Sequence, residues 1–98
     1  MHKIIIIKFL LMEINDFRSA IDKMNEPERS KEIAQLTDED FLECNLTYDL
    51  AFNSVDVIEL LTIIEREHKV TLPGMMVFYL TDKRRSIRKM LEEINRNL

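Results

Sequence analysis

The sequence is poor in the residues that make tight turns, cross-links and metal sites. Its 98 residues include one glycine, two prolines, one cysteine, two histidines and no tryptophan. So few turn-forming residues among so many helix formers argue against a sheet joined by tight turns and favour an all-α fold. The length suits one small domain with a modest core.

The scarcity of cysteine, histidine and glycine excludes several chemistries. Cys44 has no second cysteine to pair with, so no intrachain disulfide can form, and a reducing compartment such as the cytoplasm fits. His2 and His68 are isolated, so no metal site is expected. Gly74 stands alone, which excludes a glycine-rich phosphate loop.

Charge is distributed unevenly around a net value of −4. Residues 38–67 contain nine acids and one base, a local charge of −8, whereas residues 83–89 contain five bases and no acid. The acidic stretch argues against nucleic-acid binding and for docking to basic partners, with a solvated face as the alternative. Three interpretations of the basic cluster remain open. It is a solvated face, a surface that binds an acidic partner, or a surface that pairs with the acidic stretch of the same molecule.

The first twelve residues form an apolar run interrupted by Lys8. The run is too short for a membrane span, which needs about 20 residues, so no stable membrane insertion is expected. No small-residue cleavage site follows the charged start. Residues 1–12 are therefore an N-terminal extension of the first helix, an exposed apolar tail, or residues upstream of a natural start at Met12. The domain proper is expected to span residues 13–98.

Apolar residues recur at helical spacing in three segments of this domain. A first helix is expected from about Glu13 to Met24, a second from Ser54 to Lys69, and a last one capped by Thr81 and Asp82. Between the first two, residues 28–36 predict a turn or two of helix. Thr37 and Asp40 predict a capping box at the start of another short helix. The buried stripes and loop anchors of the expected fold are Ile14, Phe17, Ile21, Met24, Leu46, Leu50, Phe52, Val57, Leu60, Leu61, Ile64, His68, Ile87, Met90, Leu91, Ile94 and Leu98.

The start of the second helix carries the strongest functional signal. Asn53 is a good N-cap, and Asp56 is placed to complete a capping box. Ser54 then occupies the first helical position, where unpaired amides and the helix dipole favour an attached anion such as a phosphate ester. On capping chemistry alone, an ordinary helix start is the alternative. His68 would lie about 21 Å along the same helix, so no second catalytic group is expected near Ser54, and no enzyme activity is predicted.

The residues around Ser54 resemble a known family motif. Asp49-Leu50, Asn53-Ser54-Val55-Asp56 and Glu59-Leu60 are similar to the Asp-Leu-Gly-x-Asp-Ser-Leu-Asp-x-x-Glu-Leu motif of the acyl carrier proteins. The similarity continues without a gap through residues 64–67 to 70–73 and covers residues 46–73 well. It implies a four-helix bundle with a long first loop and a short third helix.

The resemblance also implies a function. Ser54 would carry a covalent phosphopantetheine arm, attached by a phosphopantetheinyl transferase. The arm would hold acyl intermediates as thioesters and present them to enzymes of fatty acid biosynthesis and lipid metabolism. Asp56, Glu59 and Glu65 match the family's partner-facing acids and would dock on basic patches of those acyl-processing or acyl-transferring enzymes.

Two other functions remain open. Asn53 replaces the usual Asp before the serine, and residues 75–80 are more apolar than the family's third helix. These features favour a carrier of aminoacyl or secondary-metabolite intermediates. The second alternative is a helical interaction module with no prosthetic group, self-associating through residues 1–12.

Overall fold

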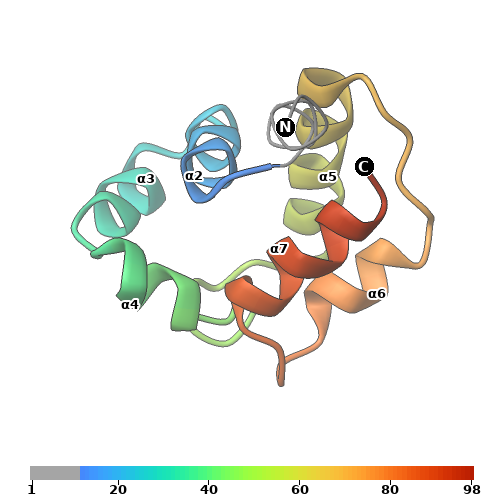
Figure 1. Cartoon of the computed structure of the whole chain (residues 1–98). Helices are drawn as coiled ribbons and strands as arrows, with labels where there is room; N and C mark the ends of the chain where they lie inside the picture. The colour runs from blue at the N-terminus through green and yellow to red at the C-terminus, as the bar shows by residue number, and fades with distance from the viewer. Residues whose placement is uncertain (1–11) are drawn as a thin grey trace, which may run out of the picture.

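The structure, a computed structural model, describes residues 12–98, and this part of the chain contains helices and no strand (Figure 1). The all-α prediction is therefore confirmed. In chain order the helices are α2 (Ile14–Asp22), α3 (Pro27–Ala34), α4 (Asp38–Glu43), α5 (Ser54–His68), α6 (Met76–Thr81) and α7 (Ile87–Arg96).

The connection between α2 and α5 contains the two short helices that the sequence predicted there. Pro27 occupies the first turn of α3, where a missing N–H costs no hydrogen bond. Thr37 caps α4, its Oγ1 accepting from the Asp40 amide at 3.1 Å. Only this half of the expected capping box forms within the described residues.

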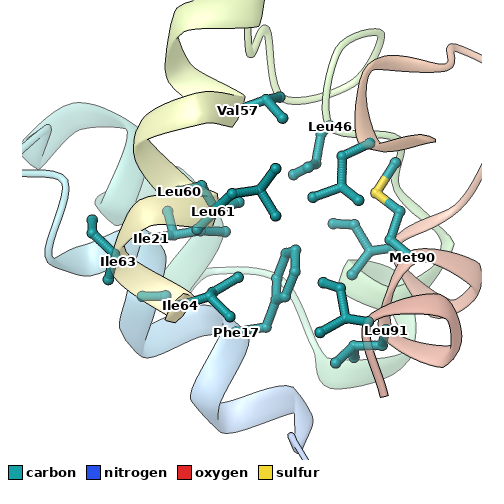
Figure 2. Close-up of a cluster of buried hydrophobic side chains, with 14 of the residues drawn as sticks. Phe17, Ile21, Leu46, Val57, Leu60, Leu61, Ile63, Ile64, Met90 and Leu91 are labelled. Carbon is teal, nitrogen blue, oxygen red and sulfur yellow. The ribbon is translucent and has the colours of Figure 1, made fainter. Parts of the chain in front are cut away.

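Helix α5 forms one wall of the core, between α2 on one side and α6 on the other. Its predicted apolar stripe is buried, and Phe17 of α2 points into the centre between α5 and α7 (Figure 2). Ile63 is buried as well, so α5 is packed on more than one side. His68, expected at the end of this stripe, is only half-buried, because it lies in the last turn beside the charged Lys23 and Glu67.

The start of α7 differs from the prediction. Thr81 and Asp82 were expected to cap it, but the helix begins at Ile87 and its cap is Ser86, whose Oγ accepts from the Lys89 amide at 3.3 Å. Thr81 instead ends α6, and the Asp82 carboxylate is bound by arginines in the intervening turn. A positive charge in the first turn of a helix opposes the helix dipole. Three of the five clustered bases precede α7, so they are not in its first turn.

The Asn45 side chain connects the loop that precedes α5 to the turn between α6 and α7 by hydrogen bonds. It is 6% exposed, and its Nδ2 donates to the carbonyls of Asp82 at 2.8 Å and Arg85 at 2.6 Å. Its Oδ1 accepts from the Tyr48 amide at 2.7 Å. Together with the buried anchors Leu46 and Phe52, these bonds fix the path of the chain toward α5.

Met12, which the sequence assigned to the extension, packs into the core and is 3% exposed. Its amide donates to Asn95 Oδ1 at 2.7 Å, and its carbonyl accepts from Asn95 Nδ2 at 3.0 Å. The expectations for residues 1–11 lie outside the described part of the chain. Among the described helices, none has the length and apolar character needed to cross a membrane.

Candidate functional site

Ser54 is exposed at the first position of α5. The predicted capping box forms in full around it: the Asp56 amide donates to Asn53 Oδ1 at 2.8 Å, and the Asn53 amide donates to Asp56 Oδ2 at 3.0 Å. The box satisfies the N3 amide but leaves the amides of Ser54 and Val55 without intrahelical acceptors. The serine hydroxyl therefore lies where amide donors and the helix dipole favour negative charge.

Arg29 of α3 contacts the junction between the preceding loop and α5. Its Nη2 donates to the Ala51 carbonyl at 3.2 Å and to Asp56 Oδ2 at 3.3 Å, and its Nη1 lies 3.0 Å from Glu26 Oε2. The guanidinium stacks 4.2 Å from the centre of the Phe52 ring. Its side chain is only 15% exposed. The contact with Asp56 joins residues that are 27 positions apart in the sequence. Helical periodicity therefore could not identify Arg29 as part of the site.

Ala51 adopts a left-handed backbone conformation with φ of 59°. This conformation favours glycine, because a Cβ crowds the following carbonyl at a cost of about 1–2 kcal/mol. The motif that this stretch resembles has glycine at this position, where the chain has an alanine in the left-handed conformation. The turn before Ser54 is therefore strained, and Arg29 binds the carbonyl of the strained residue.

The three expected docking acids are in different environments. The Asp56 side chain is 16% exposed and is shared between the capping box and Arg29. Glu65 is half-buried, and its Oε2 accepts from the Leu72 amide at 2.6 Å, which ties the end of α5 to the loop after it. Glu59 is exposed and makes no ion pair or side-chain hydrogen bond within residues 12–98. Of the three, Glu59 is the acid with its charge available to a partner.

Apolar side chains lie next to Ser54 on the same exposed side of α5. Val55 is 70% exposed and Ile58 is 51% exposed. Ile58 also borders a groove of about 130 Å³ between α5 and α6, whose other wall includes Val77 and Pro73. The serine thus stands beside a small apolar surface with an acid, Glu59, at its edge.

The remaining candidate groups do not gather around Ser54. His68 lies at the opposite end of α5, and no group of three potential metal ligands occurs in the described chain. Burial, helped by the nearby carboxylates of Asp49 and Asp40, raises the pKa of the Cys44 thiol, which disfavours its thiolate form. No catalytic pair involving Ser54 is formed by the described residues.

The basic cluster between 83 and 89 is largely matched within the molecule. Hydrogen bonds and charge from Arg84, followed by the charge of Arg85, lower the pKa of Asp82 to about 2. Arg85 also lies 3.9 Å from the centre of the Tyr79 ring. Arg88 pairs with Glu43 of the acidic stretch at 2.9 Å. The intramolecular alternative for this cluster is therefore seen in the Arg88–Glu43 pair.

Comparisons with known proteins identify no relative of this chain: no family model matches it, and neither do the curated proteins or the solved structures that were searched.

Proposed function

We propose that the chain is an acyl carrier protein with Ser54 as its phosphopantetheine attachment point. The observation that carries the proposal is an exposed serine at the first position of α5, directly inside a complete Asn53–Asp56 capping box. A phosphate ester at this position is stabilised by the free amides and the helix dipole. The acyl-carrier-like motif around it is the second support.

The proposed architecture is a four-helix bundle formed by α2, α5, α6 and α7, with α3 and α4 lying in the long connection between the first two. Helix α5 packs against both α2 and α6, and α6 packs against α7, which is compatible with such a bundle. In this proposal, α6 (Met76–Thr81) would be the short third helix of the family.

Attachment would proceed by phosphoryl transfer from coenzyme A on the transferase. The Ser54 oxygen would form a bond to the phosphorus that bears the pantetheine, and the bond from that phosphorus to the bridging oxygen of the diphosphate would break. Adenosine 3′,5′-bisphosphate would leave with that oxygen, and the hydroxyl proton would pass to a base of the transferase. The arm supplies a thiol that holds acyl groups as thioesters. The chain itself contributes the attachment point, the surface that partners recognise, and the high effective concentration that tethering gives.

Partners would dock on the exposed face of α5 next to Ser54. Val55 and Ile58 offer apolar contact, and Glu59 offers a charge for a lysine or arginine. Such encounters are fast and weaken with salt. Because Asp56 and Glu65 are already engaged inside the molecule, Glu59 should contribute most to this electrostatic attraction.

The test is co-expression with a phosphopantetheinyl transferase followed by intact mass measurement. Wild type should gain one phosphopantetheine, and Ser54→Ala should gain none. Ser19→Ala, which alters another exposed helical serine, is the matched control and should be modified like wild type. An unmodified wild type, or a modified Ser54→Ala, would contradict the proposal.

The exposed surface of α6 favours a second possibility for the cargo. Met75 and Phe78 are 78% and 76% exposed, which makes this part of the surface unusually apolar. Together with Asn53, this supports a carrier of aminoacyl or secondary-metabolite intermediates. Loading assays with acyl-activating and aminoacyl-activating enzymes would separate the two, and charging by acyl-activating enzymes alone would remove the second.

A further inference from the structure

We propose that Arg29 is a positioning residue that sets the orientation of Ser54 for modification. The proposal rests on the proposed function, because it assigns Arg29 a role at the same attachment point. Arg29 lies in α3, outside the motif that surrounds the serine, and it binds the chain on both sides of Ser54.

The guanidinium bridges the backbone before the serine and the helix after it. One nitrogen, Nη2, donates to the Ala51 carbonyl at 3.2 Å and to Asp56 Oδ2 at 3.3 Å. Ala51 is the strained left-handed residue, and Asp56 is the N3 member of the capping box. A single side chain thus fixes the three residues that lead into α5 relative to its first turn.

The shape of this contact requires arginine. The guanidinium carbon lies over the Phe52 ring, 4.2 Å from its centre, while Nη2 reaches a carbonyl and a carboxylate. Lysine has a point charge on a flexible stem and cannot reproduce the stacking together with the fork. Lysine at position 29 would keep the charge near Asp56 but would loosen the hold on the Ala51 carbonyl.

Orientation of a nucleophile affects the rate of transfer more than the binding of the carrier. Displacement of a reacting group by about 1 Å can cost on the order of 100-fold in rate. The proposed docking surface, formed by Val55, Ile58 and Glu59, makes no contact with Arg29 among the described interactions. Loss of Arg29 should therefore lower kcat of modification by about 10- to 100-fold and change KM little.

The chain contains a natural control for the structural cost of removing a buried arginine. Arg18 stacks 4.6 Å from the centre of the Phe41 ring, donates to the Ile33 and Leu36 carbonyls, and pairs with Asp38 at 3.2 Å. Its side chain is 17% exposed, close to the 15% of Arg29. Arg18 has the same chemistry as Arg29 but holds α2 to the segment that ends α3, away from Ser54.

The experiment compares wild type, Arg29→Gln, Arg29→Lys and Arg18→Gln as substrates of one transferase with coenzyme A. The assay is run at a temperature where circular dichroism shows every assayed variant folded. If Arg29→Gln does not fold at any usable temperature, the comparison of Arg29→Lys with wild type carries the test. We expect Arg29→Gln to lose kcat, Arg29→Lys to lie between it and wild type, and Arg18→Gln to match wild type. Glu59→Lys should show the opposite pattern, a raised KM with kcat retained.

A second measurement separates this proposal from the proposed function. Amide hydrogen exchange at residues 52–57 should accelerate in Arg29→Gln and stay unchanged in Arg18→Gln. If wild type is not modified at all, the carrier function fails, and exchange still reports whether Arg29 holds the junction. Unchanged exchange at these residues, or equal loss of kcat in the two glutamine variants, would overturn the positioning role.

Discussion

Ala51 is the residue at which the backbone before Ser54 is strained. Its φ of 59° costs an alanine about 1–2 kcal/mol, whereas glycine adopts this conformation freely but loses about 0.5–1 kcal/mol more entropy on folding. Ala51→Gly should therefore raise the free energy of unfolding by about 0.5–1 kcal/mol, measured by urea denaturation. Ala34→Gly, at the exposed end of α3, should lower it instead. A loss in both variants would show that Ala51 is not strained.

Asn53 makes a separate contribution through its cap. Asn53→Ala removes the acceptor of the Asp56 amide and should lower the free energy of unfolding by about 1 kcal/mol. Asn53→Asp keeps an acceptor at the same position and should stay within about 0.5 kcal/mol of wild type. Thermal and urea unfolding of the two variants provide the measurement. Equal losses would mean that the amide group of Asn53 acts through some other contact.

At the scale of single residues, the sequence predicted local partners and missed distant ones. The Asn53–Asp56 box was predictable because its two members are three positions apart and have a known chemistry. Arg29 and Asn45 were not, because their main partners lie 22 to 40 residues away and belong to elements whose packing no period encodes. Both residues hold the approach to Ser54, so the support of the candidate site was less predictable than its centre.

The turn between α6 and α7 is an element with a specific dependence on pH. Hydrogen bonds from Arg84 lower the pKa of Asp82 to about 2 in the folded chain, below the ordinary value of 3.8. A carboxyl with a depressed pKa stabilises the fold above its unfolded pKa, and this contribution is lost as pH falls through the folded pKa. Asp82→Asn should therefore be less stable than wild type at pH 7, and the difference should shrink between about pH 4 and pH 2.

Chemical denaturation of both proteins across this pH range would measure the difference. Arg84 is 87% exposed, so salt should also reduce the effect. Arg84→Ala removes the main side-chain donor but keeps the backbone amide of residue 84 and Arg85, so it should show a pH-dependent loss of the same sign as Asp82→Asn but smaller. A difference between wild type and Asp82→Asn that stays constant down to pH 2 would contradict the assigned role of Asp82.

The helices themselves were predicted to different degrees. Helix α5 was predicted to within one residue, because it has a strong cap, a long apolar period and a clear stop. The start of α7 was misplaced by several residues, because Thr81, Asp82 and Ser86 are all capable caps and sequence alone cannot rank them. The structure ranks them by competition: arginines occupy the Asp82 carboxylate, and the Thr81 hydroxyl bonds the Val77 carbonyl.

At the scale of the whole molecule, one core joins elements from both ends of the described chain. Phe17 of α2, Leu60 of α5 and Ile94 of α7 are each fully buried in it. Apolar periodicity identified these residues, but it could not say which helices pair. One helix pairing of this kind is the packing of α4 against α7, which the Arg88–Glu43 pair links.

Asn95 is the residue through which the contact between the two ends of the described chain can be tested. It accepts from the Met12 amide and donates to the Met12 carbonyl, across 83 positions of sequence, where both main-chain groups are partly buried. Asn95→Ala would leave that amide and carbonyl without their partner, so we expect it to lower the free energy of unfolding by about 1–3 kcal/mol. Urea denaturation followed by circular dichroism would measure the loss.

The control for this prediction is two positions away, at the C-cap of the same helix. Asn97 is exposed, and among the described residues its Nδ2 donates only to the Glu93 carbonyl of the helix that it caps. Asn97→Ala should therefore change the free energy of unfolding by no more than about 0.5 kcal/mol. If both variants lose the same stability, the effect reflects the end of α7 alone. A loss confined to Asn95→Ala, together with faster amide exchange at residues 12–17, would show that α7 holds the start of the described chain in place.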